Sequence, residues 1–425
     1  MKRKLNAELW DKMHYLFRDF NDRMVHVELN YDFVPDIDAL KTVIICAFEK
    51  APVLHSKFVD KKISTHWEVM PYSIDDILTV DYPENLENAV EEFLTQYIPP
   101  ESHIQMKIAL FIKDGKSTLC MVENHMCMDG GDLKYFLQAF CENYTNYVEN
   151  GISPIEFRTG SRAYTDVYSG FSKMESGVAK RLFKNINARD DHKFPLTKDS
   201  IRDTSFIARR KFSEDTLAKL KAKGKELGAT VNEMLLTAYF YSVYELANFP
   251  PSDQVMISSA IDLRRHMNSV EDKGFTNHTA WMQCAIPERG RDIFETVQYV
   301  VRSSNRFKKD KFMGLYGLPL LNFGYSILPH AASEEIIKIG YSNPYMAMSN
   351  IGILNGKQLS LSGKEPTDAF MSGAVKYKPF VLLTATTYKN VITLSMCVRG
   401  NEQDKNIVNN FFDLMEKNIK TLTGE

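Results

Sequence analysis

The sequence predicts a mixed α/β protein built as two lobes of similar size, on three observations. The chain has 425 residues, which exceeds the roughly 250–300 residues at which one hydrophobic core usually stops growing. Both halves alternate segments of strand and helix periodicity. Residues from about 152 to 200 lose that periodicity and gather Gly, Ser, Arg, Lys and Asp, which is typical of a long connection. We therefore expect one lobe on each side of this stretch and a cleft between them.

The first half contains four predicted helices and three predicted strands. Helical spacing of apolar residues covers 6–20, 36–49, 84–97 and about 131–149, and strand patterns cover 24–33, 104–112 and 117–122. Asp114 and Gly115 lie between the last two strands, as in a tight hairpin turn. Asn150 and Gly151 are a good signal for the end of the fourth helix.

The second half also alternates predicted strands and helices. Strands are expected at 205–212, up to Ile261, at 279–286 and at 346–354, with a hairpin through Lys389 and Asn390. Helices are expected from Ser213, at 231–247, at 292–307 and from Asn401. No internal sequence repeat accompanies this similarity of layout.

Composition excludes several classes of protein. A net charge of −2, from 52 Lys and Arg against 54 Asp and Glu, disfavours nucleic acid as a partner. No apolar run approaches the ~20 residues of a membrane span, and charges interrupt the first residues where a secretory signal would be apolar. Six cysteines without a CxxC pair predict neither a zinc site nor a disulfide framework, so we expect a cytoplasmic protein with reduced thiols and no metal. GxSxG, P-loop, GxGxxG and HExxH motifs are absent from the sequence.

The loop after the hairpin carries the strongest chemical signal. His125 stands at the end of a predicted strand, where an imidazole can project into a cleft and exchange a proton near neutral pH. Asp129 can cap the following helix, and Gly130 and Gly131 allow a sharp change of direction. A lone histidine is more often structural than catalytic, so the context decides.

That context resembles the HHxxxDG motif of the condensation-domain superfamily, which includes chloramphenicol acetyltransferase (CAT), alcohol acyltransferases and condensation domains of nonribosomal peptide synthetases. His125, Asp129 and Gly130 match its HxxxDG part. Three further segments are similar in the expected order: Asp262-Leu263-Arg264 to the family's DLR segment, Gly274 to Asn277 to its GxxxN segment, and Ser349-Asn350 to its SN-containing strand.

The resemblance implies two CAT-like lobes, residues 1–175 and 176–425, with a tunnel between them. It implies that His125 is the general base of an acyl transfer from an acyl thioester to a small-molecule hydroxyl or amine. Asp129 and Arg264 would form a structural ion pair between the lobes, and Asn124, Asn277, Ser349 and Asn350 would line the substrate site. The co-substrate would be acyl-CoA or an acyl-carrier thioester, with no permanently bound cofactor. A monomer close in type to stand-alone alcohol O-acyltransferases is expected.

The sequence departs from the family pattern at two points. Asn124 stands where the family has the first histidine of its motif, and the DFGWG motif of plant acyltransferases is absent, which points towards the bacterial or fungal alcohol-acyltransferase and condensation-like branches. A condensation enzyme that depends on an acyl or peptidyl carrier protein is the second hypothesis, and a catalytically inactive binding module is the third. Basic residues at 219–225 and 302–311 are interpreted either as solvated helix faces or as contacts for phosphates or an acidic carrier.

Overall fold

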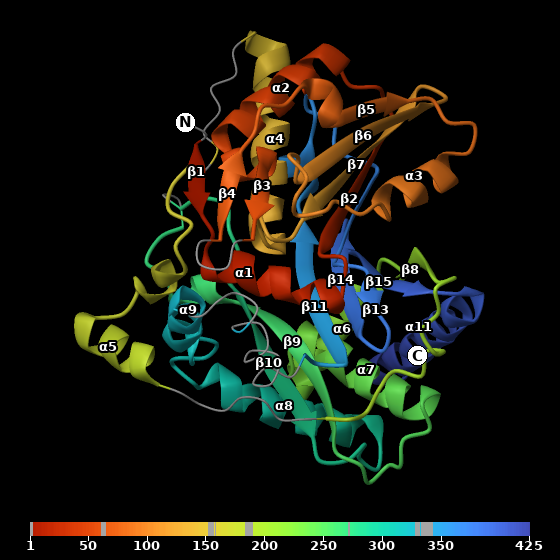
Figure 1. Ribbon diagram of the computed structural model, residues 1–425. Coiled ribbons are helices and arrows are strands. Elements are labelled where there is room, and N and C mark those ends of the chain that lie inside the picture. The colour runs from red at the N-terminus through yellow and green to blue at the C-terminus, as the bar shows by residue number, and fades with distance from the viewer. Residues whose placement is uncertain are drawn as a thin grey trace.

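The computed structural model describes residues 3–60, 65–151, 157, 159–182, 190–270, 273–327, 332 and 343–425. It confirms the mixed α/β class, with two large sheets, one in each half of the molecule, and helices packed on them (Figure 1). A small third sheet consists of β1 (Lys4–Asn6), β3 (Ser56–Val59) and β4 (His66–Val69) in the order β1-β4-β3.

The first large sheet positions the His125 loop. It has five strands in the order β12-β2-β7-β6-β5, and only the β5–β6 pair is parallel. The hairpin of β6 and β7 turns at Asp114 and Gly115, which have φ values of 52° and 72°. The strands are β2 (Met24–Tyr31), β5 (Leu78–Asp81), β6 (Met106–Lys113), β7 (Lys116–Asn124) and β12 (Asp368–Ser372).

The second large sheet has seven strands. Six follow the order β10-β9-β11-β14-β15-β13, and β8 pairs with β15. β11 is parallel to both β9 and β14. The strands are β8 (Thr204–Lys211), β9 (Val255–Asp262), β10 (Thr279–Ile286), β11 (Met346–Leu354), β13 (Lys376–Tyr377), β14 (Val381–Tyr388) and β15 (Val391–Gly400).

Helices cover these sheets, and many begin at a side-chain cap. Asp36, Asn85, Asp129, Thr230, Asp292 and Asn401 each accept a hydrogen bond from a backbone N–H of the first turn. The helices are α1 (Leu9–Leu16), α2 (Ile37–Lys50), α3 (Leu86–Leu94), α4 (Gly130–Asn150), α5 (Lys173–Arg181), α6 (Thr216–Leu227), α7 (Val231–Leu246), α8 (Ile293–Lys308), α9 (Leu318–Ile327) and α11 (Glu402–Thr423).

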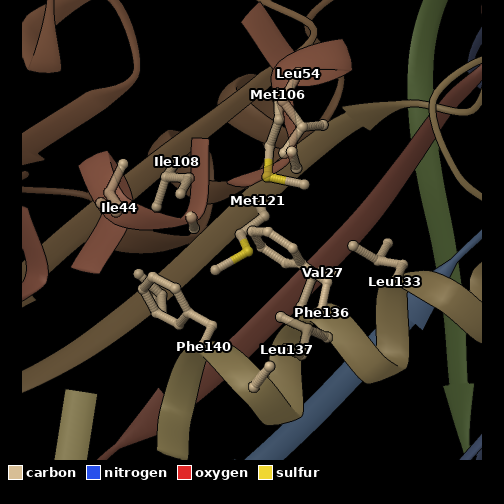
Figure 2. Packing of buried hydrophobic residues seen from close by; sticks show 14 of the residues in the cluster. Val27, Ile44, Leu54, Met106, Ile108, Met121, Leu133, Phe136, Leu137 and Phe140 are labelled. Carbon is tan, nitrogen blue, oxygen red and sulfur yellow. The ribbon is translucent and has the colours of Figure 1, made fainter. Parts of the chain in front are cut away.

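The core of the first lobe fixes the start of α4. Leu133, Phe136, Leu137 and Phe140 recur at helical spacing and are fully buried against Met121 and other side chains of the sheet and α2 (Figure 2). At roughly 25 cal/mol per Å² of apolar surface, each large side chain of this face stabilises the packing by about 1.5–3 kcal/mol. The helix that follows the His125 loop is therefore firmly anchored.

One strand of the C-terminal half lies in the first lobe. β12 pairs with β2, so that Ser372 is opposite His26 and Asp368 is opposite Asn30. The boundary at residue 175 remains a prediction, but strand pairing crosses it. Parts of β11 and β14 also reach the first core, where Leu354 and Tyr388 are buried.

Most predicted elements are confirmed within a few residues, and the differences have local causes. The predicted helix 6–20 is shorter, as α1 followed by a 3-10 turn at Phe17–Asp19. The connection expected at 152–200 contains α5, a polar helix whose only buried residue is Ala179, so it shows little apolar periodicity. Residues 152–156, 158 and 183–189 of that stretch lie outside the described part of the chain.

Candidate active site

His125 lies one residue beyond strand β7, between the two lobes. Its backbone N–H donates to the carbonyl of Arg23 at 2.8 Å, which holds the loop against the entry to β2. The side chain is half-buried. Its backbone carbonyl and Nδ1 are both engaged by one residue of the second half, Asn277.

Asn277 determines which ring nitrogen of His125 carries the proton. Its Nδ2 donates to the backbone carbonyl of His125 at 2.7 Å, and a carbonyl can only accept. The amide oxygen must then face Nδ1 of His125, 2.8 Å away, so Nδ1 carries the hydrogen. Nε2 has its lone pair free and no hydrogen-bond partner among the residues that the structure describes. This arrangement presents a base to the space between the lobes.

The surroundings of His125 favour the neutral imidazole. Burial lowers its pKa below the ordinary 6.5, and the charge of Lys376 lowers it further, against the opposing effects of Asp129 and Asn277. The ring of His14, from α1, stacks on His125 with centroids 4.3 Å apart. Burial, and then His125, holds the pKa of His14 well below its usual value. His125 is therefore a neutral base at neutral pH.

Both carboxylate oxygens of Asp129 accept hydrogen bonds from other parts of the protein, and its structural role stays a prediction. Oδ1 accepts from the backbone of Gly131 and Asp132 at 3.0 Å each, which caps α4. Oδ2 accepts from Arg264 Nη1 at 2.9 Å and from the His278 backbone at 2.7 Å. Burial would raise the pKa of Asp129, but the arginine charge and these hydrogen bonds hold it below its usual value.

The ion pair between Asp129 and Arg264 is present and larger than the sequence suggested. Arg264 also contacts Asp132 through Nη2 at 3.0 Å and Asp262 through Nη1 at 3.1 Å. Its side chain is 12% exposed, and those of Asp129 and Asp132 are 1% and 2% exposed. The acids raise the pKa of Arg264 against the effect of burial. Asp132, which the sequence reasoning missed, is thus a second partner; its i+3 spacing from Asp129 could have indicated it.

Two glycines follow Asp129, and they differ in how much space a side chain would find at each position. A Cβ on Gly130 would contact nothing within 4 Å. A Cβ on Gly131 would lie 3.2 Å from Asp129 Oδ1 and 3.3 Å from Arg264 Nη1. The absence of a side chain at Gly131 therefore leaves room for the ion pair, while the predicted part of Gly130 in the site stays a prediction.

Asn124 is fully buried and faces the protein. Its Nδ2 donates to Gln105 Oε1 at 2.8 Å, and its Oδ1 accepts from the Met126 backbone at 3.2 Å. These bonds shape the loop from beneath. The predicted substrate contact of Asn124 is untested, and this burial gives it no support. Asn277 is likewise fully buried, and its contacts are with His125.

Ser349 and Asn350 lie on β11, the strand between the lobes in Figure 1. Ser349 is half-buried and opposite Thr384, and Asn350 is exposed beside a bulge, where its Oδ1 accepts from the Gly352 backbone at 3.0 Å. Within the described ranges neither forms a hydrogen bond with His125. Their role in substrate binding stays a prediction.

A second buried ion pair, between Arg162 and Asp11, contacts the His125 loop, and sequence reasoning missed it. Arg162 forms two hydrogen bonds with Asp11, at 2.9 and 3.1 Å, and donates to the backbone of Phe275 at 2.7 Å. It also donates to the Cys127 carbonyl at 3.3 Å. Trp67 donates to the same aspartate at 2.8 Å. Arg162 lies inside the aperiodic stretch at 152–200, so no spacing rule indicated it.

Other potential sites are weaker. A cavity of about 530 Å³ is lined by residues 3–6, 50–53, 159–163 and 274–275 among others, and one of about 640 Å³ lies along α4; neither lining includes His125. The described residues contain no cluster suited to a metal and no helix long and apolar enough to cross a membrane. All six cysteines are free, and burial raises the pKa of Cys127 well above its usual value, so it is a poor nucleophile. Lys219, Lys223, Lys308 and Lys311 each pair with an acid, and both interpretations of the two basic segments stay predictions.

Comparison with known proteins gives the fold its context. No family model matches the chain, and no curated protein matches by sequence. Among solved structures, trichothecene 15-O-acetyltransferase from Fusarium sporotrichioides superposes with a TM-score of 0.71 at 12% identity, covering 97% of this chain and 94% of that one. Polyketide synthase associated protein 5 from Mycobacterium tuberculosis gives 0.68 at 14% identity, covering 97% and 98%. The first condensation domain of the calcium-dependent antibiotic synthetase gives 0.68 at 12% identity, covering 98% and 96%.

These matches establish the two-lobed CAT-like fold over nearly the whole chain. At such identities they show the fold alone, and one similar structure is an epimerization domain, so the same fold carries other reactions. The reaction has to be argued from the site.

Proposed function

We propose that the protein transfers an acyl group from a thioester, an acyl-CoA, to a hydroxyl or amine of a small molecule, with His125 as general base. The observation that carries this proposal is the double hydrogen bond of Asn277 to His125, which leaves Nε2 of a neutral imidazole as the only free base of the ring.

The transfer needs no covalent enzyme intermediate. Nε2 of His125 takes the proton from the acceptor hydroxyl as its oxygen attacks the thioester carbonyl carbon. The C–S bond of the tetrahedral intermediate then breaks, and the imidazolium returns the proton to the departing thiolate. An ester and a free thiol leave, and His125 is neutral again. General-base help of this kind contributes about 10²–10⁴-fold, and holding the two substrates between the lobes supplies much of the rest.

Asp129 and Arg264 support this chemistry without touching the reacting atoms. Their ion pair ties the start of α4 to the chain that carries Asn277, because Asp129 accepts from the backbone of the next residue, His278. Loss of activity on changing either residue would reflect lost geometry of the His125–Asn277 pair.

The test compares wild type with His125→Ala and His125→Gln. Thiol release from acetyl-CoA and longer acyl-CoAs is followed with a panel of small alcohols and amines. We expect the variants to lose about 10²-fold or more in kcat. His125→Gln keeps an amide group near Asn277, so its thermal stability should fall less than that of His125→Ala, which removes the ring that contacts the buried Asn277 and stacks on His14. Equal rates in wild type and variants would overturn the role of His125.

The carrier-dependent alternative is distinguished by the donor. Condensation domains share this fold, and one similar structure is the starter condensation domain of rhizomide synthetase in complex with C8-CoA and Leu-SNAC. Acyl groups are therefore offered both on CoA and on a phosphopantetheine carrier protein. Turnover with the carrier alone would favour the condensation reaction, and turnover with neither donor would favour an inactive binding module.

A further inference from the structure

A short segment, residues 20–24, lies between the His125 loop and strand β13 of the second sheet. On one side Arg23 accepts from the His125 backbone at 2.8 Å. On the other side Asp22 exchanges two hydrogen bonds with Val375, both at 3.0 Å, and Asn21 forms a β-bridge with Lys376. Lys376 therefore enters the site from the second lobe, next to the strand entry that supports His125.

The ammonium group of Lys376 has no hydrogen bond or ion pair within the described ranges of the chain. Burial is the main reason that its pKa falls to about 8, and Asp22 offsets only part of that effect. The residue nevertheless keeps some accessible surface, as do His14 and His125. Lys376, His14 and His125 are thus desolvated enough to lower their pKa values while each keeps some accessible surface.

Two more polar atoms of this segment are buried without a partner. Nη1 of Arg23 and Oδ2 of Asp22 form no hydrogen bond, although Arg23 is 1% exposed and Asp22 is 4% exposed. Nη2 of Arg23 donates to the Tyr97 hydroxyl at 2.6 Å, which fixes the direction of the guanidinium. Buried polar groups in folded proteins nearly always have a partner, so an unpartnered set indicates a place for water, an ion or a ligand.

The charge of this cluster is positive. Arg23 and Lys376 are cations, and burial raises the pKa of the one nearby acid, Asp22, to about 7. Lys376 also acts on His125 and His14, whose pKa values it lowers. Asp129, the acid that raises the pKa of His125, is already paired with Arg264. Unpaired buried cations are costly unless an anion joins them.

We propose that Arg23 and Lys376 bind a carboxylate of the substrate beside His125. We call residues 22, 23 and 376 the carboxylate site. Two sources share this chemistry: an acceptor that carries a carboxylate near its nucleophile, and an acyl chain that ends in one. The phosphates of CoA are at the opposite end of the pantetheine arm from the thioester and do not reach it. That the bound carboxylate belongs to a substrate rests on the proposed acyl transfer, whereas the binding test below needs no turnover.

The experiment measures the pKa of His125 by NMR of histidine-labelled protein, with His125→Gln to assign its signal. Glycolate and its neutral analogue glycolamide test the acceptor source, and succinyl-CoA and butyryl-CoA test the acyl source. A carboxylate bound at Lys376 screens its charge, so we expect the pKa of His125 to rise on the order of one pH unit with glycolate or succinyl-CoA and to stay unchanged with the neutral analogues.

Three variants make the test specific. Lys376→Met should raise the pKa of His125 in the free protein and abolish the response to the anion, and Lys376→Arg should retain the response. Lys116→Met, which removes an exposed lysine of the β6–β7 hairpin, should behave as wild type. A response that survives in Lys376→Met, that is equal with the neutral analogues, or that is absent with both anions would overturn the carboxylate site. Turnover lost in His125→Ala tests the proposed function separately.

Discussion

Two charged clusters contact the His125 loop from different sides, and they differ in how completely their polar atoms are bonded. Asp129, Asp132 and Arg264 form the first, where each carboxylate oxygen of Asp129 accepts from two donors and Arg264 contacts three acids. Arg23 and Lys376, with Asp22, form the second, where Nη1 of Arg23, Oδ2 of Asp22 and the ammonium group of Lys376 lack hydrogen bonds within the described residues. The two clusters lie within one small region.

The difference separates structural from binding charges. A fully bonded buried network holds one geometry. Removing one member leaves its partners buried without hydrogen bonds or counter-charges, which lowers the free energy of unfolding. In an incompletely bonded cluster the free protein already has buried polar atoms without partners, which is unfavourable, and a bound ligand can supply those partners. Opposite effects on stability are therefore expected when a cation is removed from each cluster.

The largest effect is expected from Arg264→Met. This substitution leaves Asp129 and Asp132 buried without their cation, which should lower the free energy of unfolding by about 3–5 kcal/mol. Chemical denaturation measures it. Lys41→Met is the control, because the Lys41–Asp38 pair is 43% and 92% exposed and should contribute about 0–1 kcal/mol.

A second change distinguishes a lost charge pair from lost packing. Adding Asp129→Asn to Arg264→Met removes one of the stranded charges, so part of the stability should return. If Arg264→Met costs no more than Lys41→Met, the network is not a structural one and the contrast between the clusters fails.

The next prediction concerns Lys376, whose substitution should raise the free energy of unfolding rather than lower it. Lys376 has a pKa of about 8 in the folded protein against 10.5 for the free side chain, so its protonated form disfavours folding below pH 8. Lys376→Met should raise the free energy of unfolding at pH 7 by up to about 3 kcal/mol, less whatever solvent screening removes at its accessible surface. The advantage should shrink as pH rises from 8 to 10.5. A destabilised variant at pH 7 would show that Lys376 is structural.

Local patterns in the sequence predicted the first cluster better than the second. Asp129 caps a helix with clear apolar periodicity, and Arg264 lies in the turn directly after strand β9, so their partnership followed from a resemblance between short motifs. Asn277 was expected to bind substrate, and its fixing of the His125 tautomer emerged only from the two hydrogen bonds.

The second cluster could not be predicted because it depends on distant pairing. Asn21 and Lys376 are joined by a β-bridge across more than 350 positions of the chain, and neither lies in a periodic segment. The strand β12, which brings the preceding chain into the first sheet, has five residues with no alternation that distinguishes it. The stacking of His14 on His125 could not be predicted for the same reason, because His14 is one residue of a predicted helix and no local pattern places its ring beside His125.

The smallest effect concerns His14 and appears only in acid. Its pKa is held well below 6.5 by burial and by His125, so below pH 6.5 the unfolded chain binds a proton that the folded protein does not. The contribution of neutral His14 to stability is therefore present above that pH and is lost as pH falls, at up to about 1.4 kcal/mol per pH unit. His14→Phe keeps a ring against His125 and removes this loss.

Thermal unfolding at pH 7.5 and pH 5.5 measures the effect. We expect His14→Phe to match wild type at pH 7.5 and to lose less stability at pH 5.5, because His26 and His278 continue to contribute their own acid sensitivity in both proteins. His14→Ala should show the same gain in acid, with lower activity since the ring of His125 loses its stacking partner. If all three proteins show the same pH dependence, His14 does not remain neutral in the folded state, and the stacked pair exchanges a proton instead of restraining the base.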